Sequence, residues 1–286
     1  MTPAARRLAV ALGAVVVAVA VAAFAVILPR AHDASPPTGG TSPPPSRAPV
    51  VPPANATFDY QIGGPYPPPR GVRVVSRDRS SAPATGLYSI CYVNAFQAQP
   101  EELGWWKHTH PDLLLRDTDG DLVVDEDWDE ALLDVSTPAK RTSAATIVGG
   151  WIDGCARSGF QAVEPDNLDS YERSGGRITR SDNVAFASLL AARAHTAGLA
   201  IGQKNAAELL AFHGHIGFDF AVTEECGRYE ECATYASAYT NRVYDIEYRP
   251  EDFTKTCGRW GTTLSIALRD LDVSPPGSPH YVFRTC

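Results

Sequence analysis

The sequence lacks the signatures of a metal site and of a nucleotide cofactor. Its six cysteines include no C-x2-C pair and no cysteine–histidine cluster, and its seven histidines never recur as His-x3-His. A glycine-rich loop of the phosphate-binding kind is also missing. Because zinc sites and nucleotide-binding folds depend on such patterns, the sequence predicts neither a metal nor a cofactor.

Basic residues are scarce outside the amino terminus. Four of the 25 lysines and arginines, but only one of the 33 acidic residues, precede residue 51, so residues 51–286 carry a formal net charge of about −11. Nucleic-acid binding draws its affinity from cationic side chains, and this balance therefore argues against a nucleic-acid partner. It is compatible with a cationic or neutral substrate.

Charge is absent from one long stretch near the amino terminus. Leu8–Leu28 is a run of 21 residues without a charged side chain, preceded by Arg6 and Arg7. That length matches the roughly 20 residues that span a bilayer, and no clear cleavage site follows. We therefore expect residues 1–34 to form a cytoplasmic stub and an uncleaved signal anchor, with the remainder of the chain outside the cytoplasm. The alternative is a cleaved signal peptide and a secreted protein.

Large apolar side chains are almost missing from residues 35–55, which are rich in Pro, Ser and Thr. Such a segment cannot bury enough surface to offset its ordering entropy, and its prolines favour an extended chain. We expect a linker here, followed by one folded domain over residues 56–286.

Residues 56–286 contain eight short apolar runs that end in charged or amide residues. Helical patterns separate the later runs, most clearly at Pro138–Ser158 and Ser181–Ala197, each followed by a glycine. Strands that alternate with helices predict a parallel sheet, and eight of them predict a (β/α)8 TIM barrel. The connections after the first two runs are too short or too proline-rich for helices, so the first units are degenerate. The expected strands are Thr57–Gln61, Val72–Asp78, Leu87–Ala95, Phe160–Asn167, Leu199–Asn205, Phe218–Glu224, Arg242–Tyr248 and Leu264–Asp270.

An insertion follows the third of these strands. Leu113–Arg116 and Leu122–Asp125 flank residues 117–121, which contain three aspartates and a glycine. The run resembles a calcium-binding loop, but position twelve is Trp128 instead of Glu. We expect a hairpin with an Asp-Gly turn. The tryptophans of the insertion either stack on sugar rings or cover the barrel mouth: Trp105, Trp106 and Trp128.

Barrels of this type place their chemistry at the carboxyl ends of the strands. The segment Gly159–Tyr171 is organised around such an end, because its apolar run stops at Glu164 and Asp166. Side chains alternate along a strand, so these two carboxylates point to the same side. A pair of carboxylates at this position is typical of a barrel hydrolase. Asn167 follows them at the same strand end. The other strand ends supply Asp59, Arg77, Asp78, Tyr92, Asn94, Lys204, Asn205, Glu224, Asp245, Glu247, Arg269 and Asp270.

Together these residues resemble the endo-α-1,4-polygalactosaminidase family, glycoside hydrolase family 114, from about Phe58 to Cys286. EPDN at Glu164–Asn167, followed some sixty residues later by EEC at Glu224–Cys226, is the most specific part. The chain departs from the usual family pattern at Thr223 and at Glu225, and its last strand ends in Arg-Asp instead of Lys-Asp. The other matching segments are Phe58–Gly64, Ile90–Ala95, Lys204–Asn205, Phe218–Cys226, Tyr229–Cys232, Ile246–Tyr248 and Arg269–Val273.

The resemblance implies cleavage of α-1,4-linked galactosamine polymers, with the acidic pair at Asp166 and Glu224. We assign Asp166 as the nucleophile or ionised stabiliser because Lys204 and Asn205 can keep it charged. Glu224 is then the general acid/base, since crowding by Glu164, Glu225 or Glu247 would favour its protonated form. A barrel hydrolase of another α-glycan and a non-catalytic carbohydrate-binding protein remain alternatives. The expected substrate ligands are Asp59, Tyr92, Asn94, Glu164, Asn167, Lys204, Asn205, Glu247 and Asp270.

All six cysteines follow the expected anchor, where disulfides are stable. Strand alternation turns Cys91 outward, toward the helix that carries Cys155, so these two can pair. Cys226 and Cys232 are close in sequence and would clip the loop after Glu224. Two buried free thiols at Cys91 and Cys155 are the alternative. The remaining pair would be Cys257 and Cys286.

Overall fold

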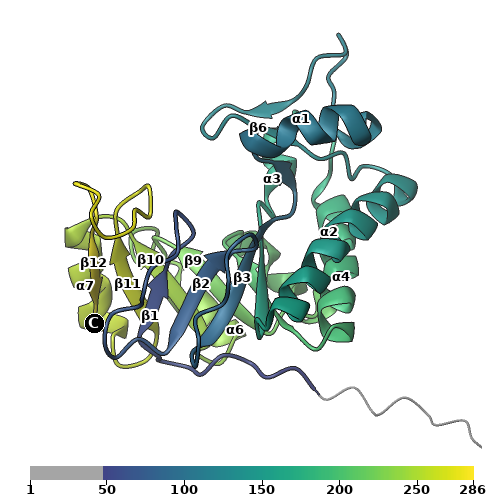
Figure 1. Cartoon of the computed structure of the whole chain (residues 1–286). Helices are drawn as coiled ribbons and strands as arrows, with labels where there is room; N and C mark the ends of the chain where they lie inside the picture. Colours follow the sequence, from purple (N-terminus) through teal and green to yellow (C-terminus); the bar gives the residue numbers. More distant parts are fainter. Residues whose placement is uncertain (1–47) are drawn as a thin grey trace, which may run out of the picture. The chain divides into compact units, whose positions relative to one another are not determined.

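Eight parallel strands form the centre of the structure, a computed structural model that describes residues 48–286 (Figure 1). Each strand pairs with the next one in chain order. All eight expected strands are present, each shortened by one or two residues at one or both ends. They are β1 (Phe58–Tyr60), β2 (Val74–Asp78), β3 (Tyr88–Asn94), β7 (Ala162–Asp166), β8 (Ala200–Lys204), β9 (Phe220–Glu224), β10 (Val243–Glu247) and β11 (Ser265–Arg269).

The barrel is nearly closed, with a seam between the first and the last parallel strand. A short strand, β12 (Phe283–Thr285), pairs antiparallel with β11 and extends the sheet beyond it. Side chains bridge the seam: the Ala56 N–H donates to Ser265 Oγ at 2.9 Å, and Arg269 Nη1 lies 3.3 Å from Asp59 Oδ1. This arrangement is consistent with the expected (β/α)8 fold.

The two predicted helices are present as α2 (Pro138–Ser158) and α4 (Arg180–Thr196). Thr137 caps α2 by accepting a hydrogen bond from the Lys140 N–H, and Gly159 ends it in the left-handed conformation, with φ of 95°. Thr179 caps α4 in a capping box, which moves its start one residue ahead of the expected position. The other helical segments are α1 (Pro100–Thr109), α3 (Ser170–Arg173), α5 (His213–Ile216), α6 (Cys232–Ala238), α7 (Pro250–Trp260) and the 3-10 turns η1 (Pro111–Leu113) and η2 (Ala207–Phe212).

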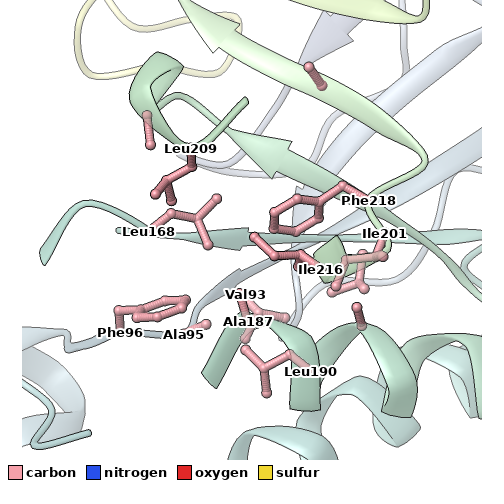
Figure 2. Packing of buried hydrophobic residues seen from close by; sticks show 14 of the residues in the cluster. Val93, Ala95, Phe96, Leu168, Ala187, Leu190, Ile201, Leu209, Ile216 and Phe218 are labelled. Atoms are coloured by element: carbon pink, nitrogen blue, oxygen red, sulfur yellow. The ribbon is translucent and has the colours of Figure 1, made fainter. Parts of the chain in front are cut away.

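Two apolar clusters lie on the two faces of the sheet. Outside the barrel, Val93 and Ile201 of the strands pack with Leu190 of α4 (Figure 2). Inside it, apolar side chains such as Phe58 and Ile90 fill the amino-terminal half of the strands. The apolar filling gives way to polar side chains toward the carboxyl ends, which is where the candidate site lies.

A buried polar network replaces helices beside the first strands. Arg77 donates to Gln61 Oε1 at 2.9 Å, and Asp59 accepts hydrogen bonds from Gln61 at 2.7 Å and from Tyr66 at 2.8 Å. Arg269 completes the network through its contact with Asp59. Short, proline-rich connections cannot form covering helices, and paired side chains satisfy the buried charges in their place.

The insertion forms a three-stranded antiparallel sheet of β4 (Gln97–Ala98), β6 (Glu130–Leu132) and β5 (Val124–Asp125). The expected hairpin is confirmed by an antiparallel bridge between Arg116 and Leu122 and by Gly120 with φ of 89°. Asp117 Oδ1 accepts the N–H groups of Asp119 and Asp121, as an Asx turn requires.

The three tryptophans of the insertion have different environments. Trp106 is fully buried in a small cluster with Leu113 and Leu133, so it supports the insertion instead of contacting a ligand. Trp105 packs edge-on against Trp106. Trp128 is 64% exposed and lines the groove described below.

The structure contains the three expected disulfides, Cys91–Cys155, Cys226–Cys232 and Cys257–Cys286, and so excludes free thiols at Cys91 and Cys155. The first joins the outer face of β3 to α2, as strand alternation predicts. The second clips the loop that follows β9, and the third ties α7 to the chain end.

The expected anchor, Leu8–Leu28, and most of the expected linker lie outside the described residues. Within residues 48–286, no helix has both the length and the apolarity needed to cross a membrane.

The three disulfides close loops of very different length, which predicts unequal effects of their removal. Cys91–Cys155 spans 64 residues and Cys226–Cys232 only 6. By loop entropy, replacing both cysteines with alanine should lower the free energy of unfolding by about 4 kcal/mol for the first pair and about 2 kcal/mol for the second. Urea unfolding of the two double variants checks this, and an equal loss for both pairs would contradict it.

Candidate active site

A lysine side chain occupies the centre of the carboxyl-terminal end of the barrel. Lys204 ends β8 and points inward, and its side chain is 1% exposed. Its Nζ lies 3.0 Å from Asp166 Oδ2, 3.3 Å from Glu224 Oε2 and 3.5 Å from Glu164 Oε1. Tyr60 Oη is 3.2 Å away. One ammonium group thus contacts carboxylates from two other strands, β7 and β9.

Asp166 is held in its ionised form at the end of β7. Burial by itself would raise the pKa of this carboxyl, but the Lys204 ammonium and the hydrogen bond from the Asn167 N–H at 2.8 Å outweigh it and lower the pKa below its usual value. The side chain retains 18% exposure and borders the groove. A carboxylate in this state can act as a nucleophile at neutral pH.

Glu224 ends β9 opposite Asp166 and is the more open of the two, with 28% of its side chain exposed. Asn205 fixes it twice, since its side-chain amide donates to Glu224 Oε2 at 2.9 Å and its Oδ1 accepts the Glu224 N–H at 2.7 Å. The Tyr248 hydroxyl donates to Oε1. These contacts hold the carboxyl in one orientation while leaving it open to solvent.

Glu164 lies below this pair and is fully buried. Its oxygens accept hydrogen bonds from Tyr60 at 2.9 Å and from Ser76 at 2.7 Å. Burial raises the pKa of Glu164 to about 7, against the lowering effect of Lys204. Glu164 therefore belongs to the support of the site instead of its surface, although strand alternation correctly placed it on the same side as Asp166.

A groove opens above these side chains. It consists of two adjoining cavities of about 490 and 360 Å³. The larger cavity runs past Asp166 to Asp125 and Arg173, and the smaller one continues past Glu224 to Tyr229. The residues common to both are Trp128, Asn205, Glu224, Tyr248 and Leu271.

Several of the expected substrate ligands meet at this groove. Tyr92, Asn167, Lys204 and Asn205 line it. Asn94 is buried behind its wall, where Oδ1 accepts a hydrogen bond from Asn167 at 3.0 Å. These five residues come from three strand ends, as expected for a barrel site.

The model of glycoside-hydrolase family GH114 matches residues 40–286, which include the whole of this site. The chain belongs to family GH114. It is accordingly a glycoside hydrolase, and the family expected from the sequence motifs is confirmed. No curated protein matches the chain.

Two solved structures place this GH114 chain among related barrels. Ega3 of Aspergillus fumigatus in complex with galactosamine is similar with a TM-score of 0.67 and 21% identity, over 84% of this chain and 98% of that one. The glycoside hydrolase domain of PelA from Pseudomonas aeruginosa is similar with a TM-score of 0.54 and 13% identity, over 78% of this chain and 97% of that one. At these identities the two likenesses establish the fold.

Two expected ligands of the GH114 site do not reach the groove. Asp59 alternates with the inward-facing Phe58 and Tyr60 and is enclosed in the polar network outside the barrel. Asp270 accepts the N–H groups of Ser274 at 2.9 Å and of Val282 at 3.2 Å, so it orders the chain after β11. Both predictions were wrong because a polar residue at a strand end can be satisfied by the protein itself.

The prediction of Glu247 as a substrate ligand was also wrong. It alternates with Ile246, which faces the barrel interior, and it is fully buried on the outer side. There it accepts hydrogen bonds from the Gly227 N–H at 2.8 Å and from Thr256 at 3.0 Å. Glu225 borders the smaller cavity, where it pairs with Arg228 at 2.9 Å. Neither contacts Glu224, and the expected crowding by these two carboxylates is absent.

Several side chains of the site were not expected from the sequence, among them Tyr60, Ser76, Tyr248 and Glu130. Strand alternation could have found Tyr60, Ser76 and Tyr248, because each lies two positions after an apolar residue that faces the barrel interior. Glu130 gave no such signal, because it belongs to β6 of the insertion and reaches the groove only through the fold.

The loop after Glu224 is held by a pair of buried carboxyls, Asp245 and Glu247. Asp245 Oδ1 accepts the Cys226 N–H at 3.1 Å, next to the contact of Glu247 with Gly227. Burial raises the pKa of both carboxyls, and for Asp245 the charge of Glu247 raises it further. A proton retained by one carboxyl allows the two to hydrogen-bond to each other.

This pair predicts a dependence of stability on pH. Because folding raises both pKa values, the pair favours the folded state most below the ordinary carboxyl pKa of about 4, and this contribution is lost as pH rises through the raised values. The variant Glu247→Gln keeps an acceptor for Gly227 and removes one charge. Urea unfolding between pH 5 and pH 8 should therefore show a flatter profile for the variant. Parallel profiles would show that the pair does not titrate in this range.

Proposed function

We propose that this protein hydrolyses polymers of α-1,4-linked galactosamine, with Asp166 as nucleophile and Glu224 as general acid/base. The observation that carries the proposal is the arrangement of these two carboxylates on either side of the Lys204 ammonium, at the floor of an open groove. Glycosidic hydrolysis requires one carboxyl to protonate the leaving oxygen and another to attack or to activate water. Family GH114 membership and the galactosamine bound to Ega3 support the choice of substrate.

The spacing of the pair favours a double displacement. Both oxygens contact the same ammonium, so Asp166 Oδ2 and Glu224 Oε2 are separated by at most the sum of the two distances, about 6.3 Å. Retaining glycosidases hold their carboxyls about 5–5.5 Å apart, whereas inverting enzymes need about 6.5–9.5 Å to admit a water molecule. We therefore propose that Asp166 attacks the anomeric carbon directly and forms a glycosyl-enzyme ester.

In the first step, Asp166 forms a bond to the anomeric carbon while Glu224 transfers its proton to the departing glycosidic oxygen. In the second step, Glu224 removes a proton from water, and the resulting hydroxide attacks the anomeric carbon and displaces Asp166. The exposure of Glu224 allows the leaving chain to depart and water to enter. The Tyr248 and Asn205 contacts keep its carboxyl oriented through both steps.

The shape of the groove supports action within a polymer. Cavity space continues on both sides of the catalytic pair, and exposed aromatic rings lie along it, with Trp128 64% and Tyr229 58% exposed. Aromatic faces stack on sugar rings at little entropic cost. Sugars bound on both sides of the cleaved bond would place that bond inside a chain.

Product analysis tests the proposed reaction. Galactosamine oligosaccharides of defined acetylation are incubated with the enzyme and the products are separated by mass. The proposal predicts shorter oligomers released from inside the chain. Cleavage of a different α-glycan alone would show that the proposed substrate is wrong. Binding without cleavage would indicate a carbohydrate-binding protein.

The catalytic pair is tested by near-isosteric replacement. Asp166→Asn and Glu224→Gln should each give a folded protein whose kcat is lower by about 1,000-fold or more, because each removes a group that acts in the transition state. Azide should partly restore turnover of the nucleophile variant. Glu230→Gln is a matched control, since Glu230 is exposed on the same disulfide loop and pairs with Lys255. A folded Asp166→Asn variant with ordinary turnover would refute the assignment.

The negative charge of the domain predicts a salt effect that depends on the substrate. Residues 51–286 carry about −11, and cationic oligomers should therefore bind more weakly as salt rises. We expect KM for de-acetylated oligomers to rise several-fold between about 0.02 and 0.5 M salt, while KM for acetylated oligomers changes little. A salt-independent KM for both would remove any role for the charge in binding.

We further propose that Leu8–Leu28 anchors the enzyme in a membrane with residues 35–286 on the outer side. The length of the uncharged run and the arginines before it support this, as do three disulfides, which suit an oxidising compartment. The full-length protein should remain in the membrane fraction after carbonate extraction. Recovery of a soluble form that begins near residue 35 would show a cleaved signal and a secreted enzyme.

A further inference from the structure

Three carboxylates of the groove, Glu130 among them, come from the insertion outside the barrel. Glu130 lies on β6 of the insertion, yet its side chain lines the same cavity as Asp166. It is only 9% exposed, so more than nine-tenths of it is removed from solvent. Placing a carboxylate in such a position is costly unless a partner compensates for the lost hydration.

Glu130 is fixed relative to the proposed nucleophile by one side chain. Asn167, which follows Asp166 directly and has φ of 66°, donates from its amide to Glu130 Oε2 at 3.3 Å and to Asn94 Oδ1 at 3.0 Å. The position of Glu130 is thus coupled to the strand end that carries Asp166. Apart from this contact, the Asn94 side chain is the one other group of residues 48–286 that stabilises the Glu130 carboxylate by hydrogen bonding, and both groups are neutral.

The remaining buried or half-buried carboxylates along the cavity have cationic partners. Asp125 and Asp169 lie 2.8 and 2.9 Å from the Arg173 guanidinium, and Asp166 and Glu224 share Lys204. Within the described part of the chain, Glu130 forms no ion pair. Burial accordingly raises the pKa of Glu130 to about 7. The site therefore contains an enclosed acceptor that a cationic ligand would satisfy.

We propose that Glu130 selects a sugar with a free amine over one with an acetylated amine in the part of the groove beside Asp166. This inference rests on the proposed function. An ammonium group can donate a charge-assisted hydrogen bond to the buried Glu130 carboxylate and neutralise it, whereas an acetamide is neutral and a sugar hydroxyl is a weaker donor.

Direct binding measurements test the selection. Calorimetric titration of galactosamine, N-acetylgalactosamine and galactose is carried out on the wild-type protein, on Glu130→Gln and on Asp127→Asn. Asp127 is exposed at the edge of the same cavity, so its replacement removes an equal charge without removing the enclosed acceptor. We expect Glu130→Gln to weaken the binding of galactosamine about 10- to 100-fold and the binding of galactose less than about threefold. Asp127→Asn should change the affinity for each of these two sugars by less than about threefold.

Kinetics separate recognition from a purely structural role. With de-acetylated oligosaccharides, Glu130→Gln should raise KM while kcat stays within about fivefold, because the amine is already bound in the ground state. Glu130→Asp keeps the charge and should retain part of the preference for galactosamine. If Glu130→Gln fails to fold in a thermal melt, Glu130→Asp decides: a reduced preference for galactosamine with intact galactose binding supports the role, and an unchanged preference overturns it.

The outcomes distinguish this inference from the proposed function. A Glu130→Gln enzyme that folds and keeps the wild-type ratio of galactosamine to galactose affinity overturns the role of Glu130, even while cleavage of galactosamine oligomers continues. An equal loss of affinity for all three sugars also overturns the selective role and indicates a structural one. A wild-type enzyme that neither binds nor cleaves galactosamine compounds overturns the proposed function itself.

Discussion

The site depends on the burial of a single ammonium group. Lys204 is almost fully removed from solvent, and a buried lysine is stable as a cation only where negative charge surrounds it. Burial by itself would lower the pKa of Lys204, but the charges of Asp166, Glu224 and Glu164 outweigh it and raise the pKa well above its usual value. In return, the ammonium keeps Asp166 ionised and sets the distance between the proposed catalytic pair. The carboxylates and the lysine are therefore one unit, in which the charge and the position of each member depend on the others.

The barrel provides this unit with support on both faces of the sheet. Inward-facing Tyr60 and Ser76 position Glu164 below the lysine. On the outer side, the Asp245–Glu247 pair holds the first residues of the loop after Glu224, and the disulfide Cys226–Cys232 closes that loop. Polar side chains at the strand ends thus have two places, the proposed catalytic site on the inner face and the anchoring of loops on the outer one.

Strand alternation explains how much of this could be predicted. The apolar runs predict the eight strands, and the alternation of Cys91 with Tyr92 correctly predicts both the outward disulfide and the inward position of Tyr92 at the groove. The same rule, applied from Ile246, would have excluded Glu247 and selected Tyr248. It fails for Glu130, whose position depends on how the insertion folds over the barrel, and no local pattern in the sequence contains that information. The anchor at Leu8–Leu28 stays a prediction, because it lies outside the described residues.

The central claim is that Lys204 holds Asp166 and Glu224 too close together for a single displacement by water. The stereochemistry of the first product tests it most directly. Proton NMR spectra recorded during the first minutes of cleavage of an α-1,4-linked galactosamine oligosaccharide distinguish the α from the β anomer before the two equilibrate. The account predicts that the new reducing end appears first as the α anomer, because two displacements retain the configuration. Initial appearance of the β anomer would contradict the direct attack by Asp166 and the spacing from which it is inferred.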